Sequence, residues 1–180
     1  MTLVSNNCAG GAILHSLGME FRTPTINLQI LPEQYPRFCE NFERYMSLEL
    51  AEVTSFDHLQ EIWLTKMFGG IPNMPFGRLD DILVCFQHYG TFKEAQEKWN
   101  ERRAKIDFSD VSFLMHARGE EYREAAEAFQ NLRIERKILL TQGFEIPGSV
   151  RFDGEAFEAV DGQLRITTVY DFGRWLGVTD

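Results

Sequence analysis

The chain has 180 residues, 44% of them hydrophobic and 13% aromatic, which favours one folded domain with a substantial core and argues against disorder. Its net charge of −9 disfavours nonspecific binding to nucleic acid or to an anionic membrane surface. No apolar run approaches the roughly 20 residues of a membrane-spanning helix, and the first residues do not resemble a secretory signal. Cys8, Cys39 and Cys85 are an odd set without close spacing, so neither a disulfide framework nor a CxxC zinc site is expected. We therefore expect a cytoplasmic protein without an integral membrane segment, metal or cofactor.

The first quarter of the chain predicts two short strands and two helices. Residues 2–4 form a brief apolar strand, and a helix follows from Ala12 to a closing glycine at Gly18. Residues 26–31 alternate apolar and polar side chains, which predicts a second strand. Apolar residues at three- and four-residue steps over 35–46 then predict one amphipathic helix.

The middle of the chain contains the clearest signals. A helix is expected from near Ser55, followed by a glycine- and proline-rich loop over residues 69–75. Residues 82–86 are continuously apolar, as in a central, fully buried strand. Asp80 and Asp81 precede this strand and are interpreted as turn or capping residues. Thr91 and Glu94 have the spacing of a capping box at the start of the next helix.

Two further strands, 111–115 and 137–141, flank a helix over 122–132. Strands alternating with helices predict an α/β fold, a three-layer α/β/α sandwich with a mainly parallel, Rossmann-like sheet. Residues 146–180 form a short β-rich extension of this single domain (1–180), with edge strands at 150–152 and 164–170 around a turn at Asp161-Gly162. A short helix near Trp175 completes the chain.

The stretch Ser5-Asn6-Asn7-Cys8-Ala9-Gly10-Gly11 is the candidate site. Asn and Gly tolerate left-handed backbone, and Gly lets a ligand or another strand approach closely. The Cys8 thiol would lie near the N-terminus of a helix, where a thiolate is favoured. Packing of a small cysteine, and capping of the turn by the Asn side chains, are the alternative interpretations.

Ligands of open α/β sheets bind outside the carboxyl ends of parallel strands. This rule collects Cys8 after the first strand, Glu33 after the second, His88 after the third and His116 after the fourth. The resulting hypothesis makes Cys8 a nucleophile, His88 its base and Glu33 the acid that orients the imidazole. Backbone amides of residues 9–11, with an Asn carboxamide, would stabilise an oxyanion. The expected ligand-binding residues are Ser5, Asn6, Asn7, Gly10, Gly11 and His116.

Several of these segments together resemble a bacterial family of unknown function that is usually labelled exopolysaccharide biosynthesis protein. The resemblance covers residues 2–145 and is carried by the following stretches: Val4 to Cys8 with Gly10-Gly11, Phe21 to Pro24, Leu31 to Glu33, Phe76-Gly77, Leu79 to Ile82, His88-Tyr89 and Lys98 to Arg103. It implies a three-layer α/β/α fold and a genomic setting among genes for capsule or surface polysaccharide. It implies no particular reaction.

The sequence is compatible with three functions. The leading hypothesis is a transferase that modifies a saccharide or related surface-polymer precursor, by acyl or related group transfer through Cys8. A glycosyltransferase-like protein that binds a nucleotide sugar or other phosphate ligand at Gly10-Gly11 is the second. The third is a non-catalytic partner in a polysaccharide assembly complex. A small-molecule or saccharide substrate is the expected partner, and a homo-oligomer is compatible with the sequence.

Overall fold

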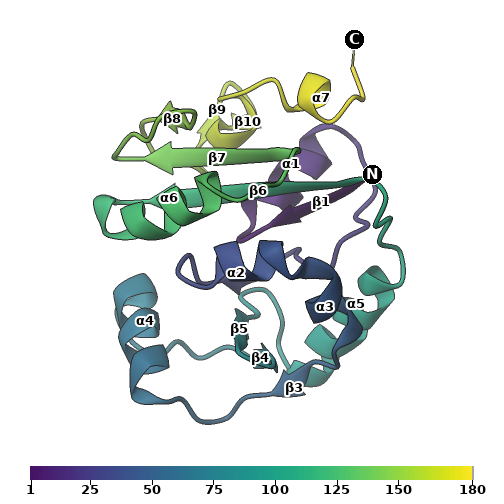
Figure 1. The fold of residues 1–180 in the computed structure, drawn as a ribbon, viewed down its shortest axis with the longest axis vertical. Helices are drawn as coiled ribbons and strands as arrows, with labels where there is room; N and C mark the ends of the chain where they lie inside the picture. The colour runs from purple at the N-terminus through teal and green to yellow at the C-terminus, as the bar shows by residue number, and fades with distance from the viewer. Residues whose placement is uncertain (180) are drawn as a thin grey trace.

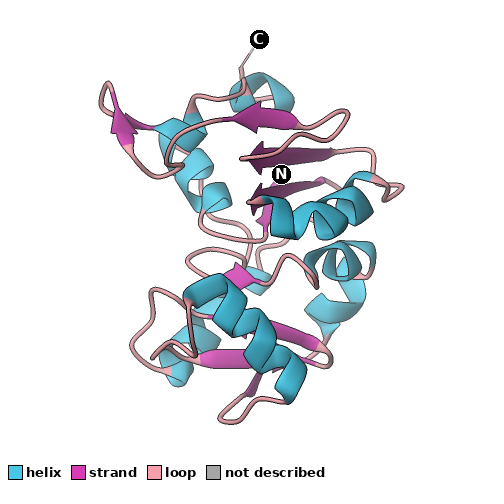
Figure 2. Cartoon of the chain, turned by 90° about the vertical axis from the view of Figure 1, so that its left-hand side faces the viewer, coloured by secondary structure: helices cyan, strands magenta, loops and turns pink. Residues whose placement is uncertain are grey.

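The computed structural model describes residues 1–179, which form two four-stranded β-sheets with helices around them (Figures 1 and 2). The first sheet has the order β1-β6-β7-β8, and each neighbouring pair is parallel. Its strands are β1 (Thr2–Ser5), β6 (Val111–Arg118), β7 (Lys137–Gln142) and β8 (Val150–Phe152). The parallel sheet predicted from alternating strands and helices is confirmed.

Successive side chains of the parallel strands enter different core clusters. Leu3 and Leu114 pack into a cluster with α1 (Ala9–Ser16). Their neighbours Val4 and Met115 pack into the cluster that contains residues of α2 (Tyr35–Glu40) and α6 (Arg123–Gln130). Because strand side chains alternate between faces, these strands are buried on both sides and read as continuous apolar runs. The sheet and its helices thus form the predicted three layers.

The second sheet is antiparallel and was not predicted. Its order is β2-β5-β4-β3, with β2 (Gln29–Ile30), β3 (Ala51–Glu52), β4 (Phe76–Leu79) and β5 (Ile82–Cys85). The expectation that residues 26–31 and 82–86 belong to the parallel sheet is wrong. Asp80, with φ of 55°, and Asp81 turn β4 directly into β5 as a hairpin. The apolar run of β5 reflects burial, which an inner strand of either kind of sheet can have.

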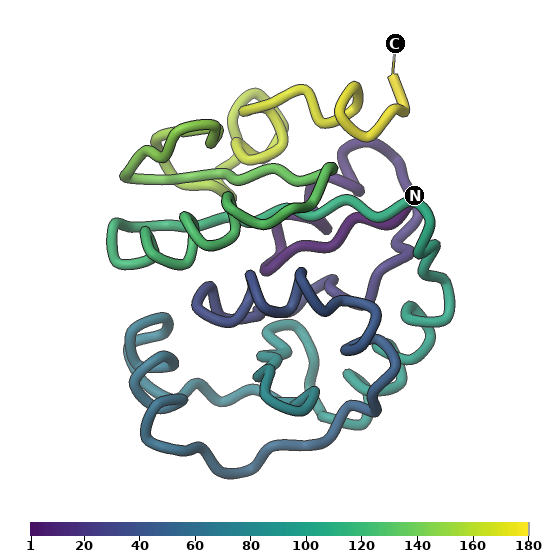
Figure 3. The backbone as a smooth tube through the Cα atoms, in the orientation of Figure 1, coloured from purple at the N-terminus to yellow at the C-terminus, as the bar shows by residue number. Residues whose placement is uncertain are grey.

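Helix α2 lies between the two sheets, and the short helix α3 (Phe42–Ser47) follows it along the side of the antiparallel sheet (Figure 3). The single helix predicted over 35–46 is interrupted at Asn41, where φ is −116° and ψ is 30°. The residues of the predicted apolar stripe are nevertheless buried in one core cluster. Phe38 and Tyr45 of this stripe share the cluster with Val4 of the parallel sheet and Val84 of the antiparallel sheet. One core therefore contacts both sheets.

The remaining helices of the middle region follow their capping residues. Helix α4 (His58–Phe68) begins after Asp57, whose carboxylate accepts the Gln60 amide, and it ends at Gly69 in the left-handed region. Helix α5 (Phe92–Arg103) begins after Thr91, whose hydroxyl accepts the Glu94 amide. The Glu94 carboxylate accepts the amide of Gly90 rather than that of Thr91, so half of the predicted capping box is present. None of the described helices is long and apolar enough to cross a membrane.

The C-terminal region is less strand-rich than predicted. The edge strand β8, the turn at Asp161-Gly162 and the final helix α7 (Phe172–Trp175) are confirmed. The strand expected over 164–170 is wrong. Only β10 (Gln163–Leu164) pairs, with β9 (Ala159–Val160), and the chain then forms the 3₁₀ helix η2 (Arg165–Thr167). Ile166 is fully buried against α1 and its neighbours, and the Thr167 hydroxyl bonds back to the Leu164 carbonyl, which favours a turn.

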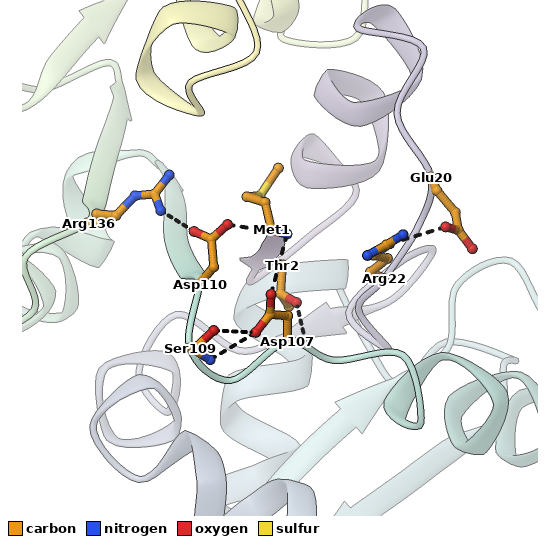
Figure 4. Close-up of polar contacts among 8 residues, drawn as sticks. All are labelled: Met1, Thr2, Glu20, Arg22, Asp107, Ser109, Asp110 and Arg136. Atoms are coloured by element: carbon orange, nitrogen blue, oxygen red, sulfur yellow. Dashed lines mark hydrogen bonds and ion pairs between the residues drawn. The ribbon is translucent and has the colours of Figure 1, made fainter.

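Polar contacts join the amino ends of β1 and β6 (Figure 4). The candidate site lies at the opposite, carboxyl ends of these strands. The Thr2 amide donates to the Asp110 carbonyl, and the Thr2 hydroxyl accepts the Asp107 amide. Asp110 also pairs with the amino group of Met1 and with Arg136. These contacts hold the sheet at the end where no ligand is expected.

The two glycines at the start of α1 differ in how closely they are packed. Neither has a positive φ, so left-handed backbone does not explain them. A Cβ on Gly10 would lie 2.6 Å from Cβ of Ser5 in β1, whereas a Cβ on Gly11 would lie 3.5 Å from the nearest atom, in Ile26. Gly10 therefore permits close contact between α1 and β1, and Gly11 borders a wider space.

This difference predicts opposite effects of one methyl group at adjacent positions. Gly10→Ala should destabilise the protein by about 1–3 kcal/mol, because two backbone elements must separate. Gly11→Ala should be neutral or stabilise by up to about 1 kcal/mol, because alanine favours helix over glycine. Urea unfolding of both variants measures this, and equal stabilities would contradict the packing role of Gly10.

Candidate functional site

The structure brings Cys8 and His88 together. Cys8 is the residue before α1, and His88 follows β5 in the other sheet. The distance between Cys8 Sγ and His88 Nε2 is 3.4 Å, and Sγ is also 3.5 Å from Gln87 Oε1. The sulfur is partly buried and the imidazole is exposed. The thiol has one proton, which can turn about the Cβ–Sγ bond toward either acceptor.

The environment of Cys8 does not favour a thiolate. Burial raises the pKa of the Cys8 thiol above its ordinary value, and the backbone amide of Cys8 itself lowers it less. The expectation of a thiolate stabilised by the helix N-terminus is thus not met. At neutral pH the sulfur keeps its proton, so nucleophilic attack requires a base.

Glu33 does not lie where the predicted triad requires it. Its carboxylate accepts a hydrogen bond of 2.9 Å from Lys66 Nζ, and no described hydrogen bond joins it to His88. The strand-end rule failed here because β2 and β5 are antiparallel, with Ile30 paired to Val84. Continuing past Ile30 toward Glu33 leads away from the end of β5 that carries His88. An orienting role for Glu33 is therefore unsupported.

Ser5 and Asn6 are fully buried, and both make their hydrogen bonds within the protein. The Asn6 carboxamide donates to the backbone carbonyl of His116 at 3.1 Å and accepts the His116 amide at 2.9 Å. The Asn6 backbone carbonyl accepts the amide of Ile30 from the second sheet. The Ser5 hydroxyl accepts the Asn7 amide at 3.4 Å. These two residues, expected to bind ligand, instead build the turn.

Asn7 and His116 belong to a hydrogen-bonded chain whose polarity is determined at both ends. At one end the Gly154 carbonyl must accept from Gln142 Nε2, so Gln142 Oε1 accepts from His116 Nε2 at 3.3 Å. His116 Nδ1 is then the acceptor for Asn7 Nδ2 at 3.2 Å. At the other end, Asn7 Oδ1 accepts the Ala9 amide at 3.0 Å. The chain requires a neutral His116, and burial lowers the pKa of His116 to about 4, with the nearby Arg118 charge acting in the same direction.

The predicted oxyanion site is occupied in part by these contacts. The Ala9 amide is bonded to Asn7, the Asn6 carboxamide is bonded to His116, and Gly10 and Gly11 are buried against Ser5 and Ile26. Close packing of α1 on β1 accounts for Gly10, whereas Gly11 has room for a methyl group.

A cavity of about 620 Å³ lies beside Asn7 and His116. Its lining combines carboxamides, both signs of charge and apolar side chains: Asn7, Gln29, Pro32, Lys66, Met67, His116, Arg118, Gly119, Glu121, Tyr122, Glu155, Ala156, Phe157 and Glu158. Lys66 Nζ lies 4.3 Å from the centre of the Tyr122 ring and donates to the Glu121 carbonyl. Burial, with the charges of Glu33 and Glu121, raises the pKa of Tyr122 to about 12, so its phenol is neutral.

Sequence reasoning missed most of this lining. Lys66 comes from α4, and Glu155 to Glu158 come from the C-terminal extension, neither of which the strand-end rule includes. Arg118 ends β6, two residues beyond the predicted His116, and could have been found by extending that strand. Gln87 could have been found as the neighbour of His88. Among residues 1–179, no group of three or more His, Cys, Asp or Glu side chains has the arrangement of a metal site.

Comparison with known proteins assigns the chain to a family. Residues 1–160 match the family model described as "Domain of unknown function (DUF1919)". The chain belongs to this family. A protein of Haemophilus influenzae described as "Uncharacterized protein" is 25% identical over 177 residues, which are 98% of this chain and 77% of that protein. The matched range of the DUF1919 domain contains Cys8, His88 and the whole cavity lining, so the candidate site lies within the family's shared domain.

The raised pKa of Cys8 predicts its reactivity. Iodoacetamide should alkylate Cys8 at pH 7 more slowly than it alkylates free cysteine, and the rate should rise with pH to above pH 9 as the thiolate forms. Buried Cys39 and Cys85 serve as internal controls that should react only after unfolding. Peptide mass spectrometry measures all three sites. A Cys8 that reacts at its maximal rate already at pH 7 would contradict the protonated thiol.

The lowered pKa of His116 predicts a pH dependence of stability. Because the unfolded histidine takes up a proton near pH 6.5 and the folded one only near pH 4, its contribution is present above pH 6.5 and is lost as the pH falls toward 4. The lost contribution is about 3 kcal/mol. His116→Gln should remove this part of the pH dependence between pH 7 and 4.5 in urea unfolding, whereas exposed His15→Gln should leave it unchanged. Equal slopes for both variants would contradict the assignment.

Proposed function

We propose that this DUF1919 protein is a thiol-dependent group-transfer enzyme in which Cys8 is the nucleophile and His88 the general base. The observation that supports it is the distance of 3.4 Å between Cys8 Sγ and His88 Nε2, within reach of a sulfur hydrogen bond, on a partly accessible turn. Cys39 and Cys85 are buried, so Cys8 is the cysteine that a substrate can reach.

The raised pKa of Cys8 determines how His88 acts. A protonated thiol resembles a serine hydroxyl in that it must lose its proton during attack, and an imidazole in contact can take that proton. The required His88 tautomer has a free Nε2 and a protonated Nδ1. Gln87 Oε1 offers the resting thiol an alternative acceptor, so proton transfer begins when the S–H bond turns from Gln87 to His88.

An acyl transfer through this pair proceeds in two balanced steps. In the first, Sγ bonds to the acyl carbon, the bond to the leaving group breaks, and the thiol proton passes through His88 Nε2 to the leaving atom. In the second, an acceptor hydroxyl gives its proton to His88 Nε2 while its oxygen bonds to the acyl carbon. The S–C bond then breaks, and the sulfur recovers the proton from His88.

The setting of the reaction is proposed from the resemblance in the sequence. The stretch around Asn6 to Cys8 and the segment at His88-Tyr89 are among those that resemble exopolysaccharide biosynthesis proteins. A cytoplasmic step that modifies a saccharide or related surface-polymer precursor fits that resemblance. The acceptor hydroxyl of the second step would then belong to the saccharide.

Acylation with p-nitrophenyl acetate tests the chemistry without the natural substrate. The protein should release p-nitrophenolate and gain one acetyl group on the Cys8 peptide, and Cys8→Ala should gain none. His88→Gln should slow acylation by roughly 10²–10⁴-fold, the usual contribution of a general base. His58→Gln, which changes another exposed histidine, should react as the wild type does.

Two outcomes would overturn the proposal. One is an acetyl group that forms equally in the Cys8→Ala variant, which would place the reaction elsewhere. The other is equal acylation rates of the His88 and His58 variants, which would remove the base from the mechanism.

A further inference from the structure

The cavity beside Asn7 and His116 has the size of a small-molecule site. Its volume of about 620 Å³ falls within the range of roughly 300–1,000 Å³ that is typical of ligand pockets. It lies at the carboxyl ends of β1 and β6, where ligands of parallel sheets bind. Its chemistry differs from that of a phosphate site.

Both cations of the lining already have a carboxylate partner. Lys66 pairs with Glu33 at 2.9 Å, and Arg118 pairs with Glu155 at 2.9 Å. The lining also contains Glu158, which pairs with Arg165 at 2.8 Å, and Glu121, which takes part in no described ion pair, so the charges around the cavity leave one unpaired carboxylate. A diphosphate would meet this carboxylate without an unpaired cation to offset it. Charge therefore disfavours nucleotide sugars at this position.

The hydrogen-bonding groups that remain fit hydroxyls. Arg118 has five N–H donors, and its described hydrogen bond uses one nitrogen. The second N–H of the Asn7 carboxamide is a further donor beside His116. The Glu121 carboxylate, which takes part in no described ion pair, is an acceptor. A hydroxyl both donates and accepts, so a ligand with several hydroxyls can use both kinds of group without bringing a charge.

Apolar surface at the same cavity fits the carbon face of a sugar ring. Phe157 lines the cavity with 47% of its surface exposed, and Met67 and Pro32 also line it. A single exposed phenylalanine is ordinary on a protein surface. An exposed ring at a cavity with paired charges and carboxamides can cover the C–H face of a pyranose while its hydroxyls reach the polar groups.

We propose that this cavity binds an uncharged saccharide, one without phosphate or nucleotide, and that this saccharide is the acceptor for the Cys8 chemistry. The second half of the statement rests on the proposed function. Asn7 provides the link, because it lines the cavity and is followed directly by Cys8, which itself lies outside the lining. The saccharide receives the group that Cys8 carries, and the donor is not bound here.

Saturation-transfer difference NMR with the full chain tests the binding. The probes are neutral di- and trisaccharides of glucose, galactose, mannose and N-acetylglucosamine. They are compared with two charged ligands, UDP-glucose as the anion and ethanolamine as the cation. Glu121→Gln and Phe157→Ala should each weaken saccharide binding by about tenfold, the scale of a hydrogen bond to a charged group. Glu124→Gln on α6 and Phe108→Ala, whose phenylalanine is also 47% exposed, are the matched controls and should bind as the wild type does.

The outcomes separate the two proposals. Saccharide binding that persists in Cys8→Ala supports the inference even if acylation by p-nitrophenyl acetate fails, and that failure counts against the proposed function alone. Acylation without binding of any neutral saccharide overturns the inference alone. Tighter binding of UDP-glucose or ethanolamine than of every neutral saccharide, or equal effects of the cavity variants and their controls, also overturns it.

Discussion

The candidate site depends on one buried carboxamide. The Asn6 side chain pairs with both backbone polar groups of His116 and so continues the contact between β1 and β6 one residue beyond the end of β1. The Asn6 carbonyl accepts the Ile30 amide and ties the antiparallel sheet to the same turn. Because β2 pairs with β5, this bond also positions the segment that carries His88. Removal of the carboxamide would leave two backbone groups unpaired in the core.

The turn next to Asn6 is fixed by the direction of its hydrogen bonds as well as by packing. A series of hydrogen bonds runs through Gln142, His116 and Asn7. It ends at the backbone carbonyl of Gly154 on one side and at the backbone amide of Ala9 on the other. Each intermediate group has only one orientation that satisfies both ends, so the tautomer of His116 and the direction of the Asn7 carboxamide are determined. Asn7 Nδ2, on a residue that lines the cavity, therefore keeps one N–H that His116 does not accept. Burial of His116 keeps the arrangement neutral over the physiological pH range.

The sequence predicted the parallel sheet because its strands are buried on both faces and alternate with helices. It predicted the pairing of Cys8 with His88 for a reason that holds only in part, since β5 belongs to the antiparallel sheet. The same rule misplaced Glu33, because a hairpin at Asp80-Asp81 reverses the chain and local patterns do not reveal which strands pair. Gly10 looked like a ligand-contacting residue, yet the neighbour that requires a glycine there, Ser5 of β1, is a tertiary contact that local sequence patterns do not show. Lys66 and Phe157 come from segments whose position follows only from packing.

Cys8 and His88, the proposed nucleophile and base, follow strands of different sheets. Cys8 lies between β1 and α1, whereas His88 follows the antiparallel hairpin, and helices α2 and α3 share one core with both sheets. A small sliding of one sheet past the other would change the sulfur-to-nitrogen distance directly, while leaving the secondary structure of each sheet intact. The reactivity of Cys8 thus depends on how the two sheets are aligned. A partner that binds the antiparallel sheet and shifts it would change the distance between Cys8 Sγ and His88 Nε2.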